Sequence, residues 1–366
     1  MNFSYNIGTK VVFGRECVRQ NAHILKEYGS KALIVTGRRS AVECGALADV
    51  REALETQGMA FEIFDRVENN PSPENVKEGG IMACRCKADF IIGIGGGSPL
   101  DAAKAIAVLA VNKIDPLELF TNKFAVPPLP IVAIPTTAGT GSEITPYSVL
   151  TRKDLNTKMS FGNDSTFPRL AMLDPGYTES LPWDVTVNTA VDALSHAVEG
   201  YLSRRSAPVS DIFAKESVMC FGECIPALIN DKINYEIREK LMYASMLGGM
   251  VITHTGTTIV HGIGYNLTYF LDIPHGKANG LVMKEFLLYN YSFAKSKIDT
   301  IFNLLNVSGA DQFGNIMDVL LPGRPRLDRQ EIESYSAITM QQRSTLNNIR
   351  EVKKEDIEEI LGKAFL

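Results

Sequence analysis

Short apolar runs alternate with amphipathic stretches between Lys31 and Ile134, and this alternation constrains the fold more than any other feature. Lys31 to Thr36 (KALIVT) is typical of a buried strand, and Cys44 to Gln57 has helical periodicity. The order then repeats. Further strands are expected at Phe61 to Phe64, Asp89 to Ile94 and Leu129 to Ile134, and further helices at Glu74 to Cys84 and Pro99 to Val111. Such units predict a parallel sheet covered by helices on both faces. Lys10 to Gly14 is expected to add an edge strand.

Long helical periods replace this alternation after about Tyr177. Pro182, followed closely by Asp184, is typical of a helix N-terminus. The helices expected here are Val185 to Leu202, Ala207 to Cys220, Ile237 to His254, Thr257 to Tyr269 and Lys353 to Ala364. A chain of 366 residues suits two domains. We therefore expect an α/β domain over residues 1–178 and an all-α domain over residues 179–366.

Composition and charge exclude several classes of partner. The net charge is -5 and the basic residues form no blocks, which argues against nucleic acid. The apolar stretch from Asp89 to Val111 is interrupted by glycines, Pro99, Asp101 and Lys104, so no membrane span is expected. The N-terminus lacks the features of a signal peptide, and the six cysteines show no CxxC pair. These features favour a cytoplasmic protein with reduced thiols.

Two glycine- and hydroxyl-rich loops follow the strands that are expected to end at Ile94 and Ile134. In the first, Gly95, Gly96, Gly97 and Ser98 open a helix, where backbone N–H groups and the helix dipole favour a pyrophosphate. Taken alone, this triplet is equally consistent with a tight turn that binds nothing. The second loop begins at Thr136 and Thr137 and falls at the same carboxyl edge of the sheet, where ligands of open α/β sheets bind. Together the loops predict a dinucleotide site.

The end of the first buried strand indicates which dinucleotide is bound. An acidic residue there would bind an unphosphorylated ribose, whereas this chain has Gly37, Arg38 and Arg39. Arginine suits planar recognition of phosphate, so the sequence favours NADP over NAD. Either arginine taken singly is equally well explained as a solvated surface residue, and the missing acid is the better evidence.

Four of the five histidines lie in the helical half. Asp192 and His196 are four residues apart in a strongly predicted helix, so their side chains share one face. His261 lies in a second helical segment, and His275 follows Pro274 in an expected loop. Singly, each histidine is more simply a satisfied structural residue. As a set, one carboxylate and three imidazoles indicate a site for Fe(II) or Zn(II).

These motifs together resemble the iron-containing alcohol dehydrogenase family, also called group III metal-dependent alcohol dehydrogenases. The resemblance covers almost the whole chain and is carried by GGGSPLDAAK, PTTAGTGSE, DALSHAVEGYLS, REKLMYASMLGGM, VHGIGYNL and IPHGKANG. It implies a Rossmann-like dinucleotide domain, an all-α metal domain, an active site in the cleft between them, and a homodimer.

The implied metal ligands are Asp192, His196, His261 and His275. The implied nucleotide contacts are Gly95, Gly96, Gly97, Ser98, Asp101, Thr136, Thr137 and Lys158, with Asn70 as a further candidate. Gly37 stands where NAD-preferring members often carry Asp, which resembles the NADP-accepting variant.

The chain departs from the family pattern at two positions. Members commonly carry HxxxH in the second ligand helix, the later histidine serving a proton relay, and this chain has Tyr265 there. His254 stands where members usually have Asn. Tyr265 and His254 are therefore the two candidates for handling the proton.

The expected activity is metal-dependent hydride transfer between NADP(H), or NAD(H), and a small, weakly polar alcohol or aldehyde. One alternative is a lyase like dehydroquinate synthase, but the region from Asp192 to Gly280 offers few clustered basic residues for a phosphorylated acid. Another is a catalytically silent nucleotide- or metal-binding protein, which only the change at Tyr265 favours.

Overall fold

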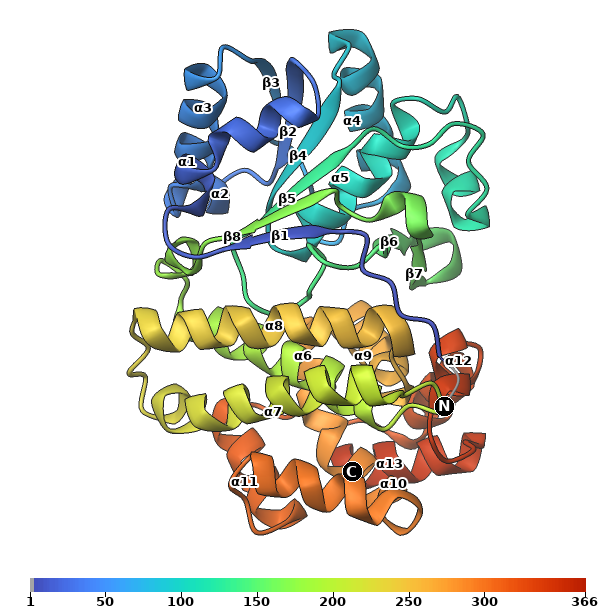
Figure 1. Cartoon of the computed structure of the whole chain (residues 1–366). Coiled ribbons are helices and arrows are strands. Elements are labelled where there is room, and N and C mark those ends of the chain that lie inside the picture. The colour runs from blue at the N-terminus through green and yellow to red at the C-terminus, as the bar shows by residue number, and fades with distance from the viewer. Residues whose placement is uncertain (1–2) are drawn as a thin grey trace. The chain divides into compact units, whose positions relative to one another are not determined.

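The computed structural model describes residues 3–366, which fall into two compact units. The sheet unit comprises Ile7–Leu181, and the helical unit comprises Pro182–Leu366 together with the described residues before Ile7. Figure 1 shows the strands gathered in the first and an all-helical second. The boundary expected near residue 178 lies at the end of η5 (Pro175–Thr178), just before the units separate.

The sheet unit is built on a six-stranded sheet in the order β1-β8-β5-β4-β2-β3, in which every neighbouring pair is parallel. Its strands are β1 (Lys10–Phe13), β2 (Lys31–Thr36), β3 (Ala60–Phe64), β4 (Phe90–Gly95), β5 (Ile131–Pro135) and β8 (Leu170–Leu173). The parallel sheet is thus confirmed, and β1 is the expected edge strand. β4 and β5 are neighbours, so the two glycine- and hydroxyl-rich loops leave adjacent strands at one edge.

Helices cover both faces of this sheet, as Figure 1 shows. Successive side chains of a strand point to opposite faces. Ala32 and Ile34 of β2 accordingly pack with α1, η1 and α3, whereas Leu33 and Val35 pack with α4 and α5. These helices are α1 (Cys17–Gln20), η1 (Ala22–Glu27), α2 (Ser40–Glu43), α3 (Ala46–Thr56), α4 (Pro73–Cys86) and α5 (Gly97–Leu109). Two apolar cores result, one on each side.

Three strands of the sheet unit escape prediction from sequence. β8 is a four-residue strand, LAML, too short to show a period, yet it lies between β1 and β5. β6 (Ser148–Arg152) and β7 (Thr157–Phe161) form a separate antiparallel hairpin with a polar turn. The remaining short elements are η2 (Pro116–Thr121), η3 (Lys153–Leu155) and η4 (Asp164–Thr166). β7 carries Lys158, one of the implied nucleotide contacts.

The helical unit contains α6 to α13. Its elements are α6 (Trp183–Tyr201), α7 (Pro208–Ile229), α8 (Tyr235–Thr255), α9 (Ile259–Leu271), α10 (His275–Leu304), α11 (Ala310–Leu320), α12 (Arg329–Met340), η6 (Arg343–Asn347) and α13 (Lys354–Phe365). α6 packs against α7, α8 and α10, so its central turns are buried. Helix α7 continues to Ile229 through an internal Pro226, beyond its expected end at Cys220. Helices α10, α11 and α12 are additional to the expected set.

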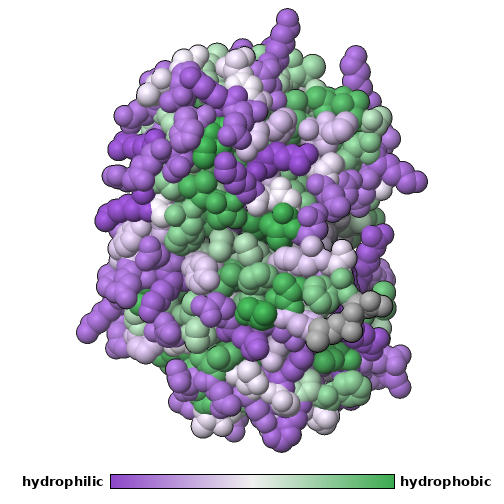
Figure 2. Space-filling model, viewed as in Figure 1, coloured by the Kyte–Doolittle hydropathy of each residue, from purple (hydrophilic) through white to green (hydrophobic). Residues whose placement is uncertain are grey.

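The surface seen in Figure 2 is a mixture of hydrophilic residues and small hydrophobic patches. The most exposed large apolar side chains include Leu346, Phe293 and Ile212, on different helices or turns. Isolated apolar side chains of this kind are ordinary on a protein surface. Among residues 3–366, no helix has the length and apolar character needed to cross a membrane.

Candidate functional site

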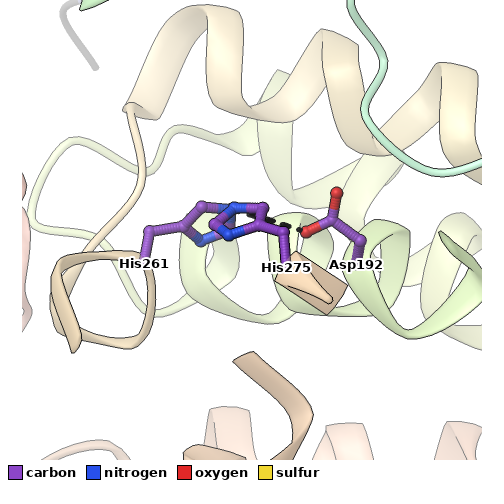
Figure 3. Close-up of side chains that lie close together, drawn as sticks. All are labelled: Asp192, His261 and His275. Atoms are coloured by element: carbon purple, nitrogen blue, oxygen red, sulfur yellow. Dashed lines mark ion pairs between the residues drawn. The ribbon is translucent and has the colours of Figure 1, made fainter. Parts of the chain in front are cut away.

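Three helices of the helical unit bring a carboxylate and two imidazoles together. Asp192 comes from α6, His261 from α9 and His275 from the start of α10, and their donor atoms all lie within 4.8 Å of one another. Oδ1 of Asp192 is 3.7 Å from Nε2 of His261 and 3.9 Å from Nε2 of His275. Figure 3 shows both rings reaching toward the carboxylate. Asp192 and His261 are buried, and His275 is partly exposed.

The position of His275 differs from the sequence expectation. It was expected in a loop, but it is the first residue of α10, which Pro274 caps. Proline before a helix presets the backbone for the first turn. At the next residue, a Cβ on Gly276 would lie only 1.7 Å from the backbone oxygen of Asn188 on α6. Gly276 therefore permits the close approach of α10 to α6 that brings His275 beside Asp192.

His196 joins this group through His261. The two Nε2 atoms are 3.0 Å apart, and the rings stack with centroids 4.7 Å apart. His196 is buried and lies one helical turn after Asp192 on α6, as the spacing predicts. One carboxylate and imidazole nitrogens converging from three helices fit the donor preferences of Fe(II) and Zn(II).

Two buried residues beside the ligands were missed from the sequence. Glu199 is fully buried and accepts a hydrogen bond from Nδ1 of His261. Burial opposes ionisation of Glu199, but the charge and hydrogen bond of His261 hold its pKa below the usual value. Asn279 donates its amide to Oδ1 of Asp192 at 3.0 Å. Glu199 lies one turn after His196 and Asn279 one turn after His275, so helical spacing from the ligands could have indicated both.

The two candidates for proton handling occupy different surroundings in the helical unit. The ring of Tyr265 stacks on His275 with centroids 5.2 Å apart, and it meets His261 edge-on at 6.2 Å. The ring of His254, near the end of α8, packs against Tyr5 at 5.7 Å. Tyr265 is therefore the candidate in direct contact with the ligand rings.

In the sheet unit, the two glycine- and hydroxyl-rich loops contact each other. The Thr136 backbone N–H donates to the Gly95 carbonyl at 2.9 Å. A Cβ on Gly96 would lie 3.2 Å from Oγ1 of Thr137, so a larger residue would crowd the second loop. Gly97 begins α5, as the phosphate-loop interpretation requires. The buried hydroxyl of Thr136 has no hydrogen-bond partner among the described residues, so a donor or acceptor of a bound dinucleotide could satisfy it.

Three of the implied nucleotide contacts are joined by hydrogen bonds. Oδ1 of Asn70 accepts from Nζ of Lys158 at 2.8 Å, and the Asn70 backbone N–H donates to Oγ of Ser98 at 3.0 Å. Asn70 has a positive φ of 58°, a conformation that asparagine tolerates better than most residues. These contacts bring a lysine from β7 to the helix that the first loop opens.

Asp101 has a structural environment that the sequence did not predict. Its carboxylate accepts from Oγ of Ser142 at 2.5 Å and from the backbone N–H of Val149 at 3.0 Å. Nζ of Lys104 lies 3.6 Å from Asp101 and donates to Oγ of Ser142 at 2.7 Å. Burial lowers the pKa of Lys104 to about 8, against the opposing charge of Asp101. This buried network, the Lys104 network, ties α5 to the second loop and to β6.

The end of β2 has room for a side chain at Gly37. The nearest heavy atom to a Cβ built there is the backbone oxygen of Val67, at 3.9 Å. Arg38 and Arg39, which follow, are exposed. An acidic residue at position 37 would therefore fit sterically, so its absence is not imposed by packing.

Comparison with known proteins identifies relatives along nearly the whole chain. The model of the family described as iron-containing alcohol dehydrogenase matches residues 8–175, and that of the Fe-containing alcohol dehydrogenase family, C-terminal, matches residues 186–320. Lactaldehyde reductase of Escherichia coli (strain K12) is 31% identical over 96% of this chain and 97% of its own. The 1,3-propanediol dehydrogenase of Klebsiella pneumoniae is 30% identical over 92% of each. The crystal structure of an iron-containing alcohol dehydrogenase from Thermotoga maritima superposes with a TM-score of 0.93 and 37% identity, covering 100% of this chain and 99% of that one.

Proposed function

The chain belongs to the iron-containing alcohol dehydrogenase family, and we propose that it transfers a hydride between NADP(H) and a small, weakly polar alcohol or aldehyde. The observation that carries this proposal is the convergence of Asp192, His261 and His275 from three helices. His196 is proposed as the fourth ligand because its Nε2 faces that of His261. Relatives named for lactaldehyde and 1,3-propanediol support a small substrate.

The residues of the chain have distinct parts in this reaction. Asp192, His196, His261 and His275 would hold a divalent metal, which would supply a Lewis acid for the substrate oxygen. A bound nicotinamide would supply or accept the hydride. The glycine- and hydroxyl-rich loops, with Asn70, Ser98 and Lys158, are proposed to hold the dinucleotide phosphates through backbone N–H groups and the lysine charge. Burial of Asp192, His196 and His261 limits access of water to their donor atoms.

Tyr265 is proposed to relay the proton through its hydroxyl, since its ring contacts both His261 and His275. Tyr265→Phe is therefore expected to lower kcat roughly a hundredfold, within the range typical of acid–base groups, and to leave KM for NADPH unchanged. Tyr269→Phe, on the same helix α9, is the matched control and should keep the parent kcat. A Tyr265→Phe enzyme with the parent kcat would show that Tyr265 is not the relay, and His254 would then be the candidate.

The cofactor proposed is NADP(H), on the evidence of Gly37 and the arginines after it. Gly37→Asp places a carboxylate where it would repel a 2′-phosphate. The ratio of kcat/KM for NADPH over NADH is expected to fall at least about tenfold, equivalent to about 1.4 kcal/mol. Initial rates with both cofactors measure this ratio. Gly37→Ala adds the Cβ without the charge and should keep the preference; an equal loss in both variants would mean that space, not charge, sets it.

The proposed reaction is tested with a panel of short aldehydes at saturating NADPH. Oxidation of NADPH is measured by the change in absorbance. Turnover of several members supports the dehydrogenase. Absence of turnover across the panel, with metal and cofactor both bound, would favour the silent binding protein. Conversion of a phosphorylated sugar acid without net NADPH oxidation would favour the lyase. The resemblance also favours a cytoplasmic homodimer, and light scattering of the purified chain measures the oligomeric state.

A further inference from the structure

We propose that Glu199 is the positioning residue of the metal site, which fixes the ring of His261 so that Nε2 faces the other ligands. The inference rests on the proposed metal site and adds a residue that does not touch the metal itself. It is carried by the hydrogen bonds of one fully buried carboxylate, in which one oxygen bonds to the ring of His261 and the other to the start of α9.

The first oxygen determines which ring nitrogen of His261 carries the proton. Oε2 of Glu199 accepts from Nδ1 of His261. A neutral imidazole carries one proton, so a proton held at Nδ1 leaves the lone pair on Nε2 available as a ligand. Nε2 is also the atom that lies 3.7 Å from Oδ1 of Asp192 and 3.0 Å from Nε2 of His196. The carboxylate therefore selects the tautomer and the ring orientation that the ligand set needs.

The second oxygen holds the carboxylate in place. Oε1 accepts from the backbone N–H of Thr258 at 2.8 Å, from its hydroxyl at 2.7 Å and from the backbone N–H of His261 at 3.3 Å. Thr258 immediately precedes α9, and the N–H groups of a first helical turn have no partner within the helix and lie at its positive dipole end. A carboxylate is favoured there. Glu199 of α6 is thus anchored to the start of α9 through Oε1, whereas the ring of His261 bonds to Oε2.

Glu199→Gln keeps the shape of the side chain and removes its charge. The expected result is a 10- to 100-fold weaker affinity for Zn(II), the usual effect of losing the partner of a metal-bound histidine. Affinity is measured on the full chain by competition with a chelator of known strength. The visible spectrum of the Co(II)-loaded protein should also change, because the orientation of one ligand changes.

Thr258→Val separates positioning of the ring from anchoring of the helix. It removes the hydroxyl donor to Oε1 but leaves the bond between Oε2 and His261. Its Zn(II) affinity is expected to stay close to that of the parent. If Thr258→Val weakens binding as much as Glu199→Gln does, Glu199 acts through the helix start and the inference is wrong.

Glu199→Asp serves as a second variant if Glu199→Gln does not fold. Its carboxylate is one methylene shorter and cannot reach both Thr258 and the ring, so at least about tenfold weaker binding is expected. Parent affinity in either folded variant overturns the inference while the metal site stands. A parent protein that binds neither Zn(II) nor Fe(II) overturns the proposed metal site itself, and the inference with it.

Discussion

His261→Ala is expected to abolish metal retention and turnover together. His261 lies at the centre of the cluster, because its Nε2 is 3.7 Å from Oδ1 of Asp192 and 3.0 Å from Nε2 of His196. Loss of the Lewis acid removes several kcal/mol of transition-state stabilisation, so kcat/KM should fall by at least about 10³-fold. Metal content by mass spectrometry and initial rates of NADPH oxidation measure the two effects.

The control for His261→Ala is His23→Ala, which removes an exposed histidine of the sheet unit. It should retain the parent metal content and rate. Because His261→Ala also removes the ring that pairs with the buried carboxylate of Glu199, circular dichroism must show that the variant is folded. A folded His261→Ala protein that kept both metal and turnover would contradict the site described here.

Lys104→Met is expected to have the largest effect on stability. Lys104 is fully buried, and its ammonium is held by Asp101, Ser142 and the carbonyl of Tyr147. Removing one partner of a buried ion pair leaves the other charge uncompensated and typically costs about 3–5 kcal/mol. The free energy of unfolding should fall by about that amount, measured by urea denaturation. NADPH affinity should fall as well, since the Lys104 network holds the second loop.

Lys240→Met is the matched control for Lys104→Met. Lys240 pairs with Glu223 at 2.8 Å, but both side chains are exposed to solvent. Exposed pairs contribute little, so a much smaller loss of stability is expected. Equal losses in the two variants would mean that removal of the lysine stem, and not of a buried charge, determines the result. Parent stability in Lys104→Met would show that the network is dispensable.

The sheet was predictable because its strands are continuous apolar runs. KALIVT of β2 is buried on both faces and matches the expected bounds, Lys31 to Thr36. β8 was not predicted because four apolar residues are too few to show a period. Its place between β1 and β5 depends on pairing across the sheet. The β6–β7 hairpin was not predicted from the sequence because its turn is polar and charged.

The site was predictable where its residues share one helix. Asp192 and His196 are four apart on α6, and the same spacing argument, extended by one turn, reaches Glu199. His261 and His275 could be assigned by sequence only as members of a set, because α10 packs against both α6 and α9 only in the folded protein. The bond between Asn70 and Lys158 joins residues 88 apart in sequence, which no local pattern indicates.

Reloading of metal-stripped protein tests the central claim most directly. The chain is freed of metal with a chelator, reloaded with Fe(II) or Zn(II), and assayed for NADPH oxidation with short aldehydes. Little turnover is expected without metal, and recovery is expected with at least one of the two ions, at one metal per chain. Full turnover by metal-free protein, or none with either ion bound, would contradict it.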